Sequence, residues 1–256
     1  MTEPISFHSQ FGEDVVLATL YSHKPRGVCI EVGANDGVHG SNTLHFEKRG
    51  WQCVLVEPNP MLCAEIRANR RAILFECAAS NQAGSATLHI AQGAWRADGM
   101  STISAKGEDH ERIARQGFST QPVEVRTCTL DSLLEQIELA GPIDFVSIDV
   151  EGHELSVLEG FTLERWKPAI LILEDNSDSS DATIRDYLSA RGYRRFRRTG
   201  VNDWFAHESN RALVNGRSSL RLAVQSFARA SRERLRQISW LRSAFRWLRS
   251  LRSSRG

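Results

Sequence analysis

The sequence predicts an α/β fold in which a mostly parallel sheet is covered by helices on both faces. Short apolar runs rich in β-branched residues alternate with amphipathic segments along most of the chain, as in sheets joined by crossover helices. The first run, residues 28–32, stops at a glycine-rich turn, which is typical of a central strand that leads into a ligand loop. Acidic residues close the later runs at Glu57, Asp149 and Glu174, where parallel strands would bring them to one edge.

The first part of the chain predicts alternating helices and strands. Asn59 is suited to cap a helix that has Pro60 at its first position. Ser41 or Asn42 is a candidate N-cap for the helix before it. The elements expected here are a helix over 7–22, a strand over 28–32, a helix over 41–49, a strand over 52–56, a helix over 60–69 and a strand over 72–77.

The second part of the body continues this alternation after a polar insertion. Residues 92–121 form a long, glycine-containing stretch between two half-exposed strands, so we expect a lid or substrate loop with a short strand at 100–103. The other elements expected are strands over 85–90 and 123–127, a helix from 129, a strand over 143–149, a helix over 155–159, a strand over 169–173, a helix over 181–190 and strands near 193–197 and 204–206.

The net charge of +1 hides a strong asymmetry between body and tail. From residue 210 onward there are 12 Arg against the single Glu233, so the tail carries +11 and the preceding part about −10. We therefore expect one domain over residues 1–208 and a separate Arg-rich tail over 209–256.

The five cysteines are scattered, odd in number and without a C-x-x-C pair. This pattern favours reduced, buried thiols in a cytosolic protein over disulfides or a zinc site. The first ten residues lack the charged and apolar regions of a signal peptide, and no run reaches the roughly 18 apolar residues that a membrane span needs. We expect a cytoplasmic protein.

The glycine-rich turn spans Gly33 to Gly37 and has the spacing G-x-x-x-G. A dinucleotide site would have G-x-G-x-x-G, so the turn predicts a different ligand. Glu31 lies inside the apolar strand and must have a partner, because an unpaired buried charge is costly; a cationic or donor-rich ligand would supply one. Asp36 could receive an ammonium or hydroxyl group, or it could simply form the turn.

Glu57 closes the strand that follows the glycine-rich turn. α/β folds use an acidic residue at this place to hold ribose hydroxyls, since a carboxylate can accept both hydrogen bonds. The alternative is a solvated charge at a strand end.

The segment from Asp149 to Glu154 is the densest group of titratable residues in the body. His153 could act as a general base near neutral pH, with Asp149 or Glu151 accepting or orienting a proton. In the alternative interpretation, Glu151 and Glu154 only favour the N-terminus of the next helix.

Asp149, Asp175 and Asn176 offer three oxygen-bearing side chains from two strand ends. This is a ligand set suited to Mg²⁺. Alternatively, Asp175 and Asn176 begin a turn with the polar residues that follow them.

Five motifs together give the chain a resemblance to the FkbM-type S-adenosylmethionine-dependent methyltransferases over residues 8–206. The motifs are Ser9-Gln-Phe-Gly-Glu-Asp14, Cys29-Ile-Glu-Val-Gly-Ala-Asn-Asp-Gly37, Val56-Glu-Pro-Asn-Pro60, Thr129-Leu-Asp-Ser-Leu133 and Ile148-Asp-Val-Glu-Gly-His-Glu154 with Leu158-Glu-Gly160. The resemblance implies a class I, Rossmann-like seven-stranded fold and transfer of a methyl group to a hydroxyl of a sugar in a glycan or of a secondary metabolite. The suggested magnesium ligands Asp149, Asp175 and Asn176 also resemble the metal site of catechol-type O-methyltransferases.

The resemblance also implies which residues hold the cofactor. The turn would bind the methionine part of S-adenosylmethionine, the next strand end its ribose, and the segment 77–80 would border its adenine. The residues implied are Glu31, Gly33, Ala34, Asn35, Asp36, Gly37, Glu57, Pro58, Ala78, Ala79 and Asp149.

Other function classes remain as alternatives. An NAD-dependent oxidoreductase is disfavoured by the glycine spacing. A non-catalytic or nucleic-acid-directed module recruited through the basic tail is the main rival, although the acidic body would repel phosphates. The molecule that accepts the methyl group cannot be read from the pattern.

The tail has apolar residues at nearly helical spacing with arginines between them, and Trp240 and Trp247 among them. This predicts an amphipathic basic helix suited to an anionic membrane surface, which would place the protein at the inner face of the membrane. Packing against a partner helix, nucleic-acid binding and disorder are the alternatives.

Overall fold

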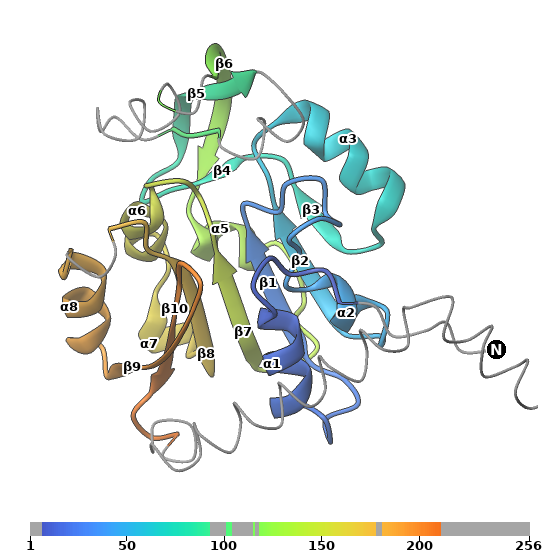
Figure 1. The fold of residues 1–256 in the computed structure, drawn as a ribbon, viewed down its shortest axis with the longest axis vertical. Helices are drawn as coiled ribbons and strands as arrows, with labels where there is room; N and C mark the ends of the chain where they lie inside the picture. Colours follow the sequence, from blue (N-terminus) through green and yellow to red (C-terminus); the bar gives the residue numbers. More distant parts are fainter. Residues whose placement is uncertain (1–6, 93–100, 104–114, 116–117, 178–180, 211–256) are drawn as a thin grey trace, which may run out of the picture.

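The structure is a computed structural model that describes residues 7–92, 101–103, 115, 118–177 and 181–210 (Figure 1). The basic helix predicted in the tail and most of the loop predicted over 92–121 lie outside these residues. No helix in the described part of the chain is long and apolar enough to cross a membrane.

The centre of the domain is a seven-stranded sheet, as predicted. Its first five strands pair in parallel, while the last two form an antiparallel hairpin at one edge. The spatial order is β3 (Ile73–Phe75), β2 (Gln52–Val56), β1 (Val28–Val32), β7 (Ile143–Ile148), β8 (Ile170–Glu174), β10 (Asn202–His207) and β9 (Tyr193–Thr199). The order changes direction at β1 and β7, which makes the ends of these two strands the expected ligand site.

The alternation of side chains along β1 separates two helical layers. Val28, Ile30 and Val32 belong to one apolar cluster, and Cys29 packs with Phe46 and the opposite cluster. The first cluster includes residues of α5 (Leu130–Leu134), α6 (Glu154–Glu159), α7 (Leu163–Trp166) and α8 (Thr183–Ser189). The opposite face is covered by α1 (Glu13–Leu20), α2 (Leu44–Glu47) and α3 (Pro60–Asn69). All five cysteines are buried free thiols, as predicted.

A second, three-stranded sheet lies beyond the carboxyl ends of β1 and β7 (Figure 1). Its order is β4 (Ala78–Ala79), β6 (Ser119–Cys128) and β5 (Gly84–Gln92). Strands β5 and β6 are longer than predicted, and the short strand predicted at 100–103 is an isolated bridge between Thr102 and His89. The small sheet therefore forms a wall above the ligand edge.

Two predicted helices differ from the structure, and one helix of the structure has no counterpart in the prediction. The helix predicted over 7–22 begins only at Glu13, because Asp14 and Glu13 accept hydrogen bonds from the backbone of residues 8–11. The helix predicted over 41–49 is confined to α2, because the residues before it turn toward Glu31. Helix α7 was not predicted. The cap at Asn59, which accepts from the Met61 amide, is confirmed.

Candidate functional site

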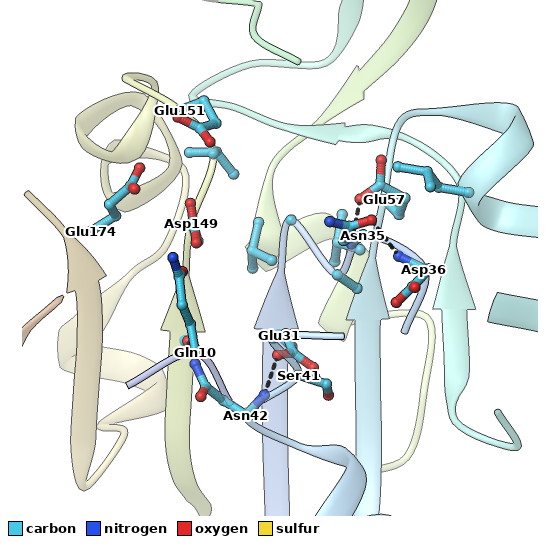
Figure 2. A pocket seen from close by; sticks show the side chains of 18 of the residues that line it. Gln10, Glu31, Asn35, Asp36, Ser41, Asn42, Glu57, Asp149, Glu151 and Glu174 are labelled. Atoms are coloured by element: carbon cyan, nitrogen blue, oxygen red, sulfur yellow. Dashed lines mark hydrogen bonds between the residues drawn. The ribbon is translucent and has the colours of Figure 1, made fainter. Parts of the chain in front are cut away.

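A cavity of about 1070 Å³ opens at the carboxyl edge of the parallel strands (Figure 2). The ends of β1, β2, β7 and β8 supply its floor, and β4, β5 and residues 7–11 supply its walls. Glu57, Asp149, Glu174 and Asn176 all line it, so the prediction that acidic strand ends meet at one edge is confirmed.

Gly33 is required where β1 meets β7. It has a φ of +81°, and a Cβ atom there would lie 1.7 Å from the Asp149 carbonyl oxygen, which is backbone and cannot move aside. The Gly33 amide also donates to Val56 at 2.9 Å, so the turn is held between two strand ends. Close packing of backbone against backbone leaves the space above it for a ligand.

Gly37 has a different role from the one predicted. It does not line the cavity, and a Cβ atom there would lie 2.9 Å from the Arg70 side chain. Its carbonyl accepts from the Arg70 guanidinium at 2.6 Å. Gly37 therefore allows the turn to pack on α3, and the predicted ligand contact at this residue gains no support from the geometry.

Glu57 joins the glycine-rich turn to the start of α3. One carboxylate oxygen accepts from the Asn35 amide and the other from the Asn59 amide, both at 2.9 Å. Asn35 has a φ of 51°, in the left-handed region that non-glycine residues rarely adopt, and this bond helps to hold it there. Each carboxylate oxygen can accept more than one bond, so Glu57 retains the capacity to bind hydroxyls in the cavity.

Glu31 finds its partner within the chain. Its carboxylate accepts from the Ser41 hydroxyl at 2.8 Å, the Asn42 amide at 2.6 Å and the Thr43 hydroxyl at 2.5 Å. We had expected a ligand to satisfy this buried charge, and the loop before α2 does so instead. Glu31 borders the cavity but mainly organises the loop beside it.

Asp36 is occupied by the turn that contains it. Its carboxylate accepts from the Val38 and His39 amides, both at 2.8 Å, and contacts the His39 ring. Although partial burial would raise it, the pKa of Asp36 is lowered by the hydrogen bonds from His39 and from the backbone. The structural alternative for this residue is therefore favoured over an ammonium-binding role.

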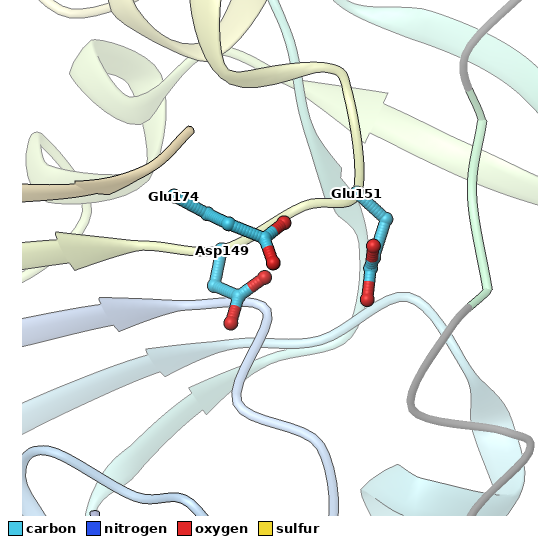
Figure 3. Close-up of side chains that lie close together, drawn as sticks. All are labelled: Asp149, Glu151 and Glu174. Carbon is cyan, nitrogen blue, oxygen red and sulfur yellow. The ribbon is translucent and has the colours of Figure 1, made fainter. Parts of the chain in front are cut away.

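Three carboxyl groups converge on the opposite side of the cavity (Figure 3). Asp149, Glu151 and Glu174 each place an oxygen within 4.8 Å of the other two. Glu151 has a φ of 54°, and the Thr102 hydroxyl donates to its carbonyl at 2.7 Å. We call Asp149, Glu151 and Glu174 the acidic trio.

The acidic trio holds protons more tightly than ordinary carboxyl groups do. Surrounding protein and the charges of Glu151 and Glu154 raise the pKa of Asp149 to about 8. Burial, followed by the charge of Asp149, raises the pKa of Glu174 well above its usual range. Like charges this close cannot all ionise cheaply, so a shared proton or a divalent cation is needed.

Not all predicted catalytic and metal residues meet here. The His153 ring bonds the Ser80 hydroxyl at 3.0 Å and does not line the cavity, so its role as a base gains no support from the geometry. Asp175 bonds Arg198 at 3.2 Å and the Ser177 amide at 2.9 Å. In the predicted ligand set of Asp149, Asp175 and Asn176, the Asp175 carboxylate serves the turn and the guanidinium, so its role as a metal ligand gains no support from the geometry.

The remaining predicted cofactor residues lie around the cavity as expected. Ala34 and Asn35 follow Gly33, while Pro58 follows Glu57. Ala78 and Ala79 form β4 on the wall, where small side chains leave room. Residues that the sequence did not indicate also line the cavity: Gln10, Ser41, Asn42, Ser147 and Asn202. The buried charge of Glu31 was the one signal that could have identified the polar residues at 41 and 42.

Comparison with known proteins gives one family and several distant relatives. A family model described as the methyltransferase FkbM domain matches residues 31–195. Hexuronic acid methyltransferase AglP of Haloferax volcanii is 26% identical over 188 residues, which are 69% of this chain and 67% of that protein.

Two solved structures are similar at lower identity. Precorrin-6y C5,15-methyltransferase from Geobacter metallireducens GS-15 is 14% identical with a TM-score of 0.36, covering 75% of this chain and 84% of that one. The O-methyltransferase from Bacillus cereus in complex with SAH is 15% identical with a TM-score of 0.35, covering 80% and 82%.

Proposed function

The chain belongs to the methyltransferase FkbM family, and on this premise we propose that it transfers the methyl group of S-adenosylmethionine to a hydroxyl group of a sugar. Membership follows from the family match over residues 31–195, which is well over half of the chain. The distant relative named as a hexuronic acid methyltransferase supports a sugar acceptor. The observation that carries the proposal is that Asp149 lines the cavity beside the turn at Gly33, where its carboxyl group can meet an acceptor hydroxyl.

The side of the cavity formed by Glu31, Gly33, Glu57, Ala78 and Ala79 fits S-adenosylmethionine, the methyl donor, and we call it the donor side. The absence of a side chain at Gly33 lets the turn pack against the backbone of Asp149, which leaves the space above the turn for the methionine part. Glu57 would hold the ribose hydroxyls, and the small residues Ala78 and Ala79 would border the adenine. When bound, S-adenosylmethionine supplies a methyl group on a sulfonium, which is already activated for transfer.

The chain itself contributes alignment and a base. Holding the acceptor hydroxyl in line is the larger contribution, because positioned reactants avoid much of the entropic barrier. Asp149 then takes the hydroxyl proton, and a base with a pKa near the working pH is suited to this step. Glu174 lies beside Asp149 and holds a proton of its own, because its pKa is raised well above the usual range, while Glu151 borders the same space.

A screen of acceptors tests the proposed function. The full chain is incubated with methyl-labelled S-adenosylmethionine and one of three acceptors: a hexuronic acid glycoside, a neutral hexoside or a phenolic hydroxyl compound. We expect label in one of the sugars and none with Asp149→Asn. Label in the phenol alone would overturn the sugar assignment. A further incubation with RNA should give no label, because no Lys or Arg is among the described residues lining the cavity.

For the tail we propose an anionic membrane surface as the partner, which would place a cytoplasmic protein at the inner membrane face. The 12 Arg and the two tryptophans of this segment support attachment to phosphate headgroups. Co-sedimentation with anionic liposomes should be lost on deletion of residues 211–256. Equal binding by the truncated chain would reject this partner.

A further inference from the structure

Residues 7–12 run past the cavity without forming a helix or strand, and we call them the N-terminal strap. The strap lies outside residues 31–195, which carry the family match. Five of its residues nevertheless line the cavity, at positions 7 to 11. A site drawn from the matched residues alone would therefore omit one of its walls.

Two buried carboxylates hold the strap in place. Asp14 accepts from the His8 amide at 2.5 Å, the Ser9 amide at 3.2 Å and the Ser9 hydroxyl at 2.5 Å. Its neighbour Glu13 accepts from the Phe11 amide at 2.9 Å. Both carboxylates belong to residues that are 0% exposed. The residues on either side of Gln10 are thus fixed by two separate side chains.

The same strap is tied to two distant parts of the domain. Glu13 also accepts from Thr199 at 2.8 Å and from Asn202 at 2.9 Å, at the hairpin of β9 and β10. The Gly40 amide donates to the His8 carbonyl at 2.9 Å, beside the loop that follows β1. Burying two carboxylates is costly unless each is fully hydrogen-bonded, and here their bonds are used to fix a segment that is not part of the sheet. This arrangement is explained if the strap presents a side chain at a set position.

Gln10 is that side chain. It extends into the cavity with its amide directed toward Asp149 (Figure 2). It makes no hydrogen bond to another of the described residues, although its neighbours in the strap are all bonded. A side-chain amide offers both donors and an acceptor, so Gln10 can bind a ligand that needs both.

The charge of the cavity indicates what such a ligand group would be. The described lining residues include many carboxylates but no Lys or Arg. Burial and the positive charges of Lys48, Arg70 and His39 lower the pKa of His8 to about 4, so its ring is neutral at pH 7. The His39 ring already contacts Asp36. A ligand carboxylate in this cavity must therefore be received by neutral donors.

We infer that Gln10 binds the amino-acid end of S-adenosylmethionine, with its amide nitrogen donating to the α-carboxylate and its amide oxygen accepting from the α-ammonium. The inference rests on the proposed function, since it takes this cofactor as the ligand. The zwitterionic end of the cofactor needs one donor and one acceptor, and the cavity offers the carboxylate no cation. The N-terminal strap, which precedes β1 in the chain, thus supplies part of the cofactor site.

Calorimetry with two ligands tests the inference. S-adenosylhomocysteine carries the amino-acid end, and 5′-methylthioadenosine shares the nucleoside and sulfur but lacks that end. We expect Gln10→Ala to weaken S-adenosylhomocysteine binding about tenfold or more, since the lost bonds are to charged groups. Binding of 5′-methylthioadenosine should change less than about twofold. Gln10→Glu, which loses the amide donor and repels the carboxylate, should lose at least as much.

The matched control is Gln136→Ala, because Gln136 is exposed and its side chain donates to the Ser132 carbonyl on α5, away from the cavity. Equal losses for both ligands in Gln10→Ala, or no loss for either, would overturn the role of Gln10. If the wild-type chain binds neither ligand, the proposed function fails instead. Thermal unfolding of each variant shows whether the fold is retained, and 5′-methylthioadenosine binding reports an intact nucleoside site.

Discussion

The two sides of the cavity are built on opposite principles. On the donor side, the buried carboxylates of Glu31 and Glu57 accept hydrogen bonds from the chain at 2.5 to 2.9 Å. On the other side, the acidic trio brings three carboxyl groups within 4.8 Å of one another, and the surrounding protein and the neighbouring carboxylates raise the pKa values of Asp149 and Glu174. The carboxylates of the donor side are satisfied by the chain without a ligand. Within the acidic trio, ionisation of all three carboxyl groups is unfavourable.

The difference separates positioning from chemistry. Residues that only hold a cofactor can be satisfied by the chain itself, so they stabilise the fold and the site together. A base must exchange a proton near neutral pH, which requires an environment that disfavours its charge. Substitutions should therefore divide into those that damage stability and those that damage turnover, and the following predictions run from the largest expected effect to the smallest.

Gly33→Ala should have the largest effect. The new Cβ would meet the Asp149 carbonyl at 1.7 Å and would also be placed at a φ of +81°. We expect a loss of at least about 3 kcal/mol in the free energy of unfolding, measured by denaturant titration. Gly50→Ala is the control, since Gly50 has a φ of +82° with nothing within 4 Å of a Cβ, and it should lose only about 1 kcal/mol. Equal losses would contradict the close packing of β1 on β7.

Asp149→Asn should mainly affect turnover. The amide cannot take a proton from the acceptor, so we expect kcat to fall on the order of 10² to 10⁴ while the fold is retained. Glu65→Gln, an exposed change at the rim of the same cavity, is the control and should leave kcat unchanged. A variant at residue 149 with wild-type kcat would remove this group from the mechanism.

Glu57→Gln should mainly affect cofactor affinity. The amide keeps one acceptor oxygen but loses the charge, so the affinity for S-adenosylhomocysteine should fall about tenfold. We expect some loss of stability too, because the Asn35 and Asn59 amides each donate to this carboxylate. An unchanged dissociation constant would remove Glu57 from the ribose site.

The pH dependence of stability should distinguish the two sides. The pKa of Asp149 is raised to about 8 in the folded chain, with Glu151, Glu154, Glu174 and Glu31 facing it. Between about pH 4 and pH 8 the folded chain binds a proton at Asp149 that the unfolded chain lacks, so this group's contribution to stability falls as the pH rises through that window. In Asp149→Asn that decline is absent, and the stability of the variant relative to wild type should increase from pH 5 to pH 8. A difference independent of pH would contradict the raised pKa.

Chelation should have the smallest effect. We expect protons on Asp149 and Glu174, and not a cation, to relieve the repulsion within the acidic trio. Excess EDTA added to an active preparation should leave turnover unchanged. A loss of activity that Mg²⁺ restores would assign the acidic trio a metal instead, as its spacing would also permit.

The sequence predicted the donor side better than the acidic side, for a physical reason. The turn at Gly33 and the carboxylate of Glu57 are local features of one strand–loop–helix unit each, so their spacing is visible in the chain. The partners of the acidic trio depend on the register of β7 beside β8, which set Glu174 beside Asp149 and turned Asp175 toward Arg198. In a strand, successive side chains alternate, so an error of one residue exchanges a site residue for a structural one.

The role of Glu31 and the position of Gln10 depend on contacts with distant parts of the chain, so the local sequence did not predict them. Glu31 was identified as needing a partner, but its donors come from the loop ten to twelve residues later. Gln10 lies before the first strand, in a segment for which the spacing of apolar residues predicted a helix over 7–22, whereas α1 begins at Glu13. Long-range bonds of Glu13 to the β9–β10 hairpin override that local preference.

The central claim is that the cofactor is held by the donor side and not by the acidic trio. Calorimetric titration of the full chain with S-adenosylhomocysteine tests it directly, using wild type, Glu57→Gln and Glu174→Gln. We expect one site per chain in the wild type, about tenfold weaker binding in Glu57→Gln and a change of less than about twofold in Glu174→Gln. No binding by the wild type, or a larger loss in Glu174→Gln than in Glu57→Gln, would contradict it.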